Sequence, residues 1–73
     1  MIDCTKTYQT RNGKRVVNLT NVPFNSAGDK VTFPIKGTII VREKPLKTSY
    51  AIWTIEGKYD VFRDNLWDLI EIN

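Results

Sequence analysis

The stretch Val31-Thr32-Phe33-Pro34-Ile35-Lys36-Gly37-Thr38-Ile39-Ile40-Val41-Arg42 decides the fold class of this 73-residue chain. Apolar side chains recur at alternate positions from Val31 to Val41, and mostly polar residues stand between them. A period of two residues is typical of a β-strand with one buried face. Pro34 has no amide hydrogen to donate, which indicates a sheet edge or an irregularity, and Gly37 indicates a bend or bulge.

Shorter strands are predicted before this stretch. Residues 8–11 and 14–19 flank Asn12-Gly13, a pair typical of a tight β-hairpin with a type I′ turn, because both residues tolerate positive φ. Residues 21–30 are rich in Pro, Asn, Ser, Gly and Asp, a composition typical of a loop.

Further strands are predicted after it. Residues 42–47 form a charged connection, and residues 50–55 carry large side chains on both faces, which favours a central strand. Glu56-Gly57-Lys58 turns the chain, and residues 59–62 are placed to pair back. For residues 65–72 we favour a last strand entered through one helical turn, since Leu66, Leu69 and Ile70 also fit a helix.

These elements predict a single all-β domain over residues 1–73. A curled antiparallel sheet or an SH3-like barrel of about five strands fits such short strands and tight turns. A domain of this length needs most of its apolar side chains for the core, which favours a flat or shared site over an enclosed cleft.

The composition argues against catalysis. The chain has no histidine, which removes the commonest general base and metal ligand, and it has a single cysteine. Asp60, Asp64 and Asp68 are spaced four apart, but we interpret them as a solvated face of an extended segment and predict no metal or other cofactor. No apolar run reaches signal-peptide or membrane-spanning length, so we expect a cytoplasmic protein without a membrane partner.

The charge is unevenly distributed along the chain. Residues 1–48 hold nine Lys/Arg and three Asp/Glu, whereas residues 49–73 hold two Lys/Arg and five Asp/Glu. This asymmetry is compatible with ordinary solvated faces, with a basic face that meets an anionic partner, or with two copies that associate through opposite charges.

Four short motifs follow one another along the chain: Thr10-Arg11-Asn12-Gly13-Lys14-Arg15-Val16, Phe33-Pro34-Ile35-Lys36-Gly37, Trp53-Thr54-Ile55-Glu56-Gly57-Lys58-Tyr59 and Asp68-Leu69-Ile70-Glu71-Ile72. Their order and spacing resemble those of a group of small bacteriophage and prophage proteins. The resemblance spans most of the chain and implies an accessory protein that acts in the cytoplasm of a bacterial host. Such proteins typically act by binding a host factor stoichiometrically. Some thereby block a defence system, and others sequester a nucleotide signal.

Three functions therefore remain open at the level of the sequence. The first is a non-enzymatic protein that binds and inhibits or modulates a host protein or defence system, with candidate contacts at Phe24, Arg42, Lys44, Leu46, Lys47, Tyr50 and Trp67. The second is a nucleotide or nucleic-acid binder, with candidate contacts at Tyr8, Arg11, Lys14, Arg15, Lys36 and Tyr59. The third is a virion or structural assembly component, which would form oligomers. Among the aromatic residues we expect Phe33 and Trp53 in the core, and Tyr8, Phe24, Tyr50 and Tyr59 at the surface.

Overall fold

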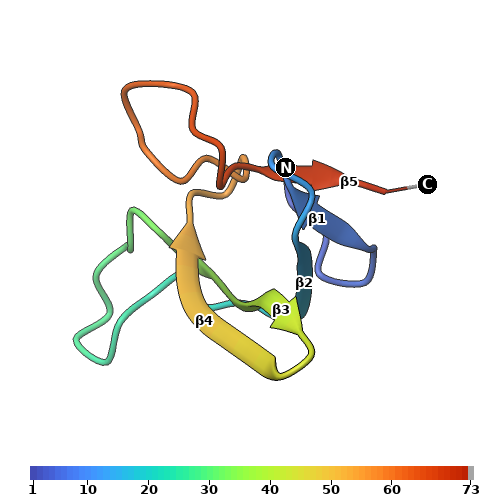
Figure 1. Ribbon diagram of the computed structural model, residues 1–73. Coiled ribbons are helices and arrows are strands. Elements are labelled where there is room, and N and C mark those ends of the chain that lie inside the picture. Colours follow the sequence, from blue (N-terminus) through green and yellow to red (C-terminus); the bar gives the residue numbers. More distant parts are fainter. Residues whose placement is uncertain (73) are drawn as a thin grey trace.

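The computed structural model describes residues 1–72 as one antiparallel sheet with the strand order β4-β3-β2-β1-β5. The strands are β1 (Tyr8–Thr10), β2 (Arg15–Asn21), β3 (Ile35–Glu43), β4 (Leu46–Trp53) and β5 (Leu69–Glu71). The sheet curls from β4 through β3 and β2 towards β1 and β5 (Figure 1), but over the described residues it does not close into a barrel. The all-β prediction and the curled-sheet alternative are confirmed.

A bulge curves the sheet where β2 crosses the glycine of β3. The register between these strands shifts between Val17 and Thr20, and Asn18 takes the left-handed conformation with φ 58°. A Cβ at Gly37 would lie 2.8 Å from Cδ2 of Leu19 and 3.3 Å from Cζ3 of Trp53. Glycine is therefore required here because core side chains occupy the space of a Cβ atom, and the predicted irregularity at Gly37 is confirmed.

Three turns of the chain share one five-residue geometry, in Thr10-Arg11-Asn12-Gly13-Lys14, Asn25-Ser26-Ala27-Gly28-Asp29 and Thr54-Ile55-Glu56-Gly57-Lys58. The first residue donates its N–H to the fifth carbonyl and accepts the N–H of the glycine at its own carbonyl, at distances of 2.8–3.0 Å. The fifth N–H donates to the side-chain oxygen of the first residue. Each glycine has φ between 84° and 86°, as in a type I turn closed by a glycine bulge.

The hairpin predicted at Asn12-Gly13 is confirmed, and its predicted type I′ turn is wrong. Only Gly13 of that pair has positive φ. The side chain of Thr10 accepts from the N–H of Lys14, which stabilises the wider turn in place of the two-residue one.

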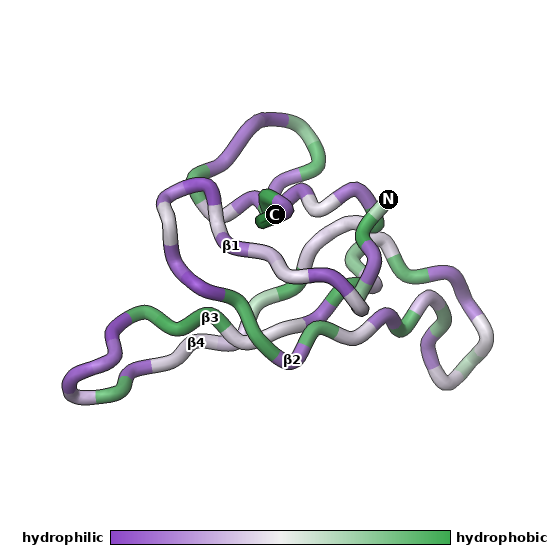
Figure 2. The backbone as a smooth tube through the Cα atoms, turned by 90° about the vertical axis from the view of Figure 1, so that its right-hand side faces the viewer, coloured by the Kyte–Doolittle hydropathy of each residue, from purple (hydrophilic) through white to green (hydrophobic). Residues whose placement is uncertain are grey.

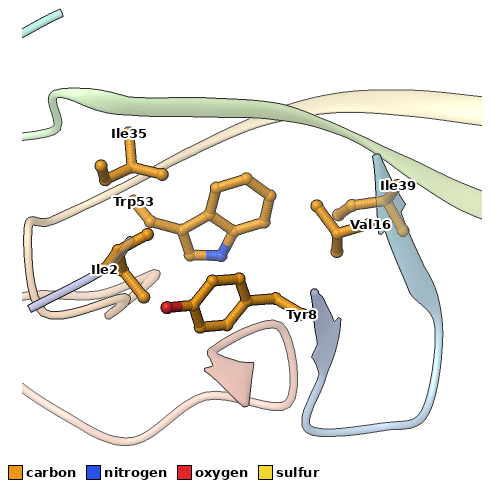
Figure 3. Packing of buried hydrophobic residues seen from close by; sticks show 6 residues of the cluster. All are labelled: Ile2, Tyr8, Val16, Ile35, Ile39 and Trp53. Carbon is orange, nitrogen blue, oxygen red and sulfur yellow. The ribbon is translucent and has the colours of Figure 1, made fainter. Parts of the chain in front are cut away.

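The core lies inside the curl of the sheet. It consists of Ile2, Tyr8, Val16, Ile35, Ile39 and Trp53, and Figure 3 shows the Trp53 indole lying beside the ring of Tyr8. Trp53 is fully buried, and its Nε1 donates to the carbonyl of Trp67 at 2.7 Å. Burying a large apolar side chain contributes about 1.5–3 kcal/mol, so this cluster holds the strands of a small chain together.

Several predicted elements differ from the structure. The strand predicted at residues 50–55 is β4, and it is an edge strand and not a central one, with Tyr50 and Ile52 exposed on its outer face. Residues 59–62 form no strand, since the N–H groups of Tyr59 and Phe62 donate to the carboxylates of Asp68 and Asp60 and not to a neighbouring strand. β5 is entered through a turn at Asn65 in place of the predicted helical turn. Residues 1–72 contain no helix long and apolar enough to cross a membrane.

Candidate functional site

The outer face of the β3–β4 pair carries a row of exposed side chains. Ile35 and Trp53 are paired across the strands and point into the core, so the next pair, Lys36 and Ile52, points outward. Tyr50 follows on the same face, opposite Thr38. Tyr50 is 89% exposed and Ile52 is 48% exposed, so this part of β4 presents apolar surface to solvent.

An open groove of about 770 Å³ lies over this face. Its aromatic walls are Phe33, which precedes β3, Tyr50 of β4, and Tyr59 of the following loop. Lys36 and Ile52 also line it, and we call these five residues the aromatic groove. A groove walled by aromatic rings with one lysine can bind an apolar or aromatic group and an anionic group at once.

A second depression continues the groove onto the loop at residues 59–65. It shares Phe33 and Tyr59 with the groove and adds Val61 and Phe62. Phe62 is 94% exposed and Val61 is 50% exposed. The apolar surface therefore runs from β4 across the groove to this loop.

The buried carboxylate of Asp68 fixes the loop that carries Tyr59. Its Oδ1 accepts the N–H of Tyr59 at 2.8 Å, and its Oδ2 accepts the N–H of Asn65 at 3.0 Å. The side chains of Arg11 and Lys58 each donate to Oδ2 at 3.2 Å. One carboxylate thus ties both ends of the loop to the first hairpin, and Tyr59 is positioned by these bonds.

The charged groups around Asp68 shift one another's pKa values. Burial alone would raise the pKa of Asp68, but the N–H groups of Tyr59 and Asn65 and the ammonium of Lys58 outweigh it, so the pKa lies below its ordinary value. The hydrogen bond to Asp64 is the main cause that raises the pKa of Lys58. These groups are therefore ionised at neutral pH and satisfied by one another.

The tip of the β3–β4 hairpin is basic, and Figure 2 shows this hairpin as a long arm that projects from the rest of the chain. Arg42 lies opposite Lys47 in the strand register, and Lys44 is at the turn. None of the three forms an ion pair with a carboxylate of residues 1–72, whereas Glu43 beside them pairs with Arg15 at 3.5 Å. Leu46 adds an apolar side chain that is 69% exposed.

The structure brings together part of the residue set predicted for a protein partner. Arg42, Lys44, Leu46 and Lys47 share the hairpin tip, and Tyr50 follows them along β4 towards the groove. Phe24 is exposed on the loop before β3 and does not line the groove. Trp67, the last residue of this set, is half-buried and packs against the core, away from the hairpin tip.

The residue set predicted for a nucleotide is dispersed. Tyr8 was expected at the surface, which is wrong, because its ring is 4% exposed and its hydroxyl accepts the N–H of Asp3. Arg11 pairs with Asp68 and Arg15 with Glu43. Lys14 lies at the first turn, and Lys36 and Tyr59 alone of this set line the groove.

Sequence reasoning missed other members of the site. Phe33 was expected in the core, yet it is half-buried, lies outside the core cluster and forms a wall of the groove. Val61 and Phe62 were interpreted as a returning strand, and Ile52 as part of a central one. The missed signal was the pair Tyr50 and Ile52 on the face opposite Trp53. Large apolar residues on the second face of a strand indicate either a central strand or an exposed binding face.

The comparisons with known proteins give no assignment for this site: no protein-family model, curated protein or solved structure matches the chain.

Proposed function

We propose that this chain is a non-enzymatic accessory protein of the bacteriophage type, which binds a host protein through the aromatic groove and the adjoining loop and so inhibits or modulates it. The observation that carries this proposal is the exposure of Tyr50 and Phe62, at 89% and 94%, beside Ile52, Tyr59 and Val61. A contiguous exposed apolar patch is typical of an interaction surface, because its burial against a partner is favourable.

The setting of these side chains supports a protein partner. Tyrosine and phenylalanine supply much of the binding energy in protein interfaces when they enter a partner's pockets. The hydrogen bond from the N–H of Tyr59 to Asp68 preorganises one wall of the groove, which lowers the ordering cost of binding. The phage-type role rests on the motif resemblance.

The test is a quantitative pull-down from bacterial lysate with the wild-type chain, with a Tyr50→Ser/Phe62→Ser variant, and with Phe24→Ser as matched control. Phe24 is also an exposed aromatic residue, at 58%, but it lies outside the groove. We expect a host protein that the wild type and F24S retain and that the double variant loses. The proposal fails if no protein is enriched, or if the double variant retains the same protein as well as the wild type does.

A second candidate function is the binding of a nucleotide or single-stranded nucleic acid in the same groove. The observation that favours it is the position of Lys36 among Phe33, Tyr50 and Tyr59, because aromatic stacking beside a lysine is how single-strand binders hold base and phosphate. Titration of fluorescent oligonucleotides tests it. Binding that weakens steeply with salt and is lost in Lys36→Gln supports this function, and absence of binding at low salt rejects it.

A further inference from the structure

The edge strand β4 leaves one side of its backbone without a partner. It pairs with β3 along its whole length, and within residues 1–72 no loop backbone donates to or accepts from residues 46–53. An eight-residue edge strand with exposed apolar side chains is a template for pairing with another strand. Within residues 46–53 the edge carries a single protective charge, that of Lys47, and Pro45 precedes the strand.

The two ends of this edge carry opposite charge. At the start of the strand lies the basic tip with Arg42, Lys44 and Lys47, which lack ion-pair partners among the described residues. Arg42 and Lys47 lie directly opposite each other, an arrangement that is unfavourable in the isolated chain. After the strand come the exposed carboxylate of Glu56, which pairs with the N-terminal ammonium of Met1 at 3.3 Å, and the half-buried Asp60.

We propose that the partner of this edge is the β4 strand of a second copy of the chain, paired antiparallel about a two-fold axis at Tyr50. Tyr50 then lies opposite the second copy's Tyr50, and Thr48 lies opposite its Ile52. A two-fold axis perpendicular to the sheet keeps the outer faces of both copies on the same side, so the two sheets become one continuous sheet of ten strands.

The charge pattern selects a second copy over an unrelated strand. Antiparallel pairing brings the basic tip of each copy beside the segment at residues 54–60 of the other, where Glu56 and Asp60 lie. A two-fold axis makes this contact twice, so one surface is complementary to itself at both ends. In this register Lys44 of each copy lies opposite Glu56 of the other, and Tyr50 forms an aromatic cross-strand pair.

A charge-swap experiment tests the proposal. Lys44→Glu/Lys47→Glu makes the tip acidic, and Glu56→Lys/Asp60→Lys makes the opposite segment basic. We expect each double variant alone to raise the dimer dissociation constant at least about tenfold in sedimentation velocity, because like charges then meet at both ends. An equimolar mixture of the two variants restores the dimer, because the acidic tip meets the basic segment and the basic tip meets the acidic segment.

The control is Lys14→Glu/Lys30→Glu, which changes the net charge as much as the tip variant does and leaves the edge intact. It is expected to dimerise as the wild type does. Circular dichroism establishes that each variant is folded before its association is interpreted. The proposal is overturned if the wild type sediments as a monomer up to millimolar concentration, or if the mixed folded variants fail to associate.

Hydrogen–deuterium exchange supplies a readout that needs no substitution. The amides of β4 that point away from β3 are expected to exchange more slowly as the wild-type concentration rises through the dimerisation range. The amides of β5, the other edge, are expected to stay unchanged. Concentration-independent exchange along β4 rejects strand pairing even if the chain forms dimers by another surface.

This inference goes beyond the proposed function and can fail separately from it, since the purified chain alone decides it. If it holds, the two aromatic grooves lie on one continuous face. A partner with two matching sites would then bind with avidity greater than one groove provides.

Discussion

The group of side chains and N–H groups bonded to Asp68, which we call the Asp68 cluster, adjoins the aromatic groove at Tyr59. The two regions differ in burial and in whether their groups find partners within the fold. At Asp68, with 2% of its surface exposed, the carboxylate accepts donors from Arg11, Lys58, Tyr59 and Asn65. In the groove, Tyr50 stays almost fully exposed, and folding gives it no partner. A polar group that is buried must be satisfied within the fold, whereas an exposed apolar group can be satisfied only by something outside it. The first region therefore stabilises the fold, and the second is the surface through which we propose that the chain binds a partner.

The largest expected effect is that of Asp68→Ala. Removing the carboxylate leaves two backbone N–H groups and the Arg11 guanidinium without their acceptor and Lys58 with Asp64 alone, which is expected to lower the free energy of unfolding by about 3 kcal/mol. Denaturant unfolding measures it. Asp64→Ala is the matched control, because Asp64 also binds Lys58 but is exposed, so its loss is expected to change stability little. Equal stability of the two variants would contradict the structural role of Asp68.

The two Thr-x-x-Gly-Lys turns give the next comparison. Alanine at Gly13 would meet no atom within 4 Å, so Gly13→Ala carries only the cost of positive φ, about 1 kcal/mol. A Cβ at Gly57 would lie 2.8 Å from Cδ1 of Ile2 and 3.2 Å from Cβ of Leu69. Gly57→Ala is therefore expected to cost about 2 kcal/mol. Thermal unfolding of both variants tests the difference. A greater loss of stability for G13A than for G57A would contradict the close packing of Gly57 against Ile2 and Leu69.

A smaller effect is expected from acid, because protonation leaves the Asp68 side chain in place. The pKa of Asp68 is lowered in the folded chain, so the unfolded chain binds the proton more readily. The stability due to this shift is present above the ordinary pKa of about 4 and is lost as the pH falls through the lower folded pKa. Unfolding free energies of wild type and Asp68→Asn, measured over this range, should converge as the pH falls. A constant difference between them would contradict the linkage.

The sequence predicts much of the fold, because periodicity and turn chemistry are local signals. The alternation around Ile35 and Ile39 places the longest strand, and Asn12-Gly13 places the first hairpin. The edge position of β4 could not be predicted in this way. It depends on strand order, which is set by contacts between distant residues such as Trp53 and the carbonyl of Trp67.

The site was predicted less well, for the same reason. Tyr50 and Tyr59 were expected at the surface and are exposed there. The predictions for Phe33 and Tyr8 were both wrong. Phe33, expected in the core, lines the groove, and Tyr8, expected at the surface, is buried because its hydroxyl has a partner in the N–H of Asp3. Spacing along the chain gives no information about such a partner. Nothing in the sequence indicated that Asp68 accepts hydrogen bonds from several segments, since its donors come from residues as far apart as Arg11 and Asn65.

The smallest expected effect on stability belongs to the side chains on which the proposed binding depends most. Tyr50→Ser/Phe62→Ser removes two aromatic rings that fold without a partner, so the free energy of unfolding is expected to change by no more than about 0.5 kcal/mol. Denaturant unfolding of this variant beside Asp68→Ala measures both ends of the comparison. A large loss of stability would mean that the rings pack within the isolated chain. With stability unchanged, any loss of a partner in the pull-down is a loss of contacts and not of the fold, so the two measurements together separate a binding surface from a structural one.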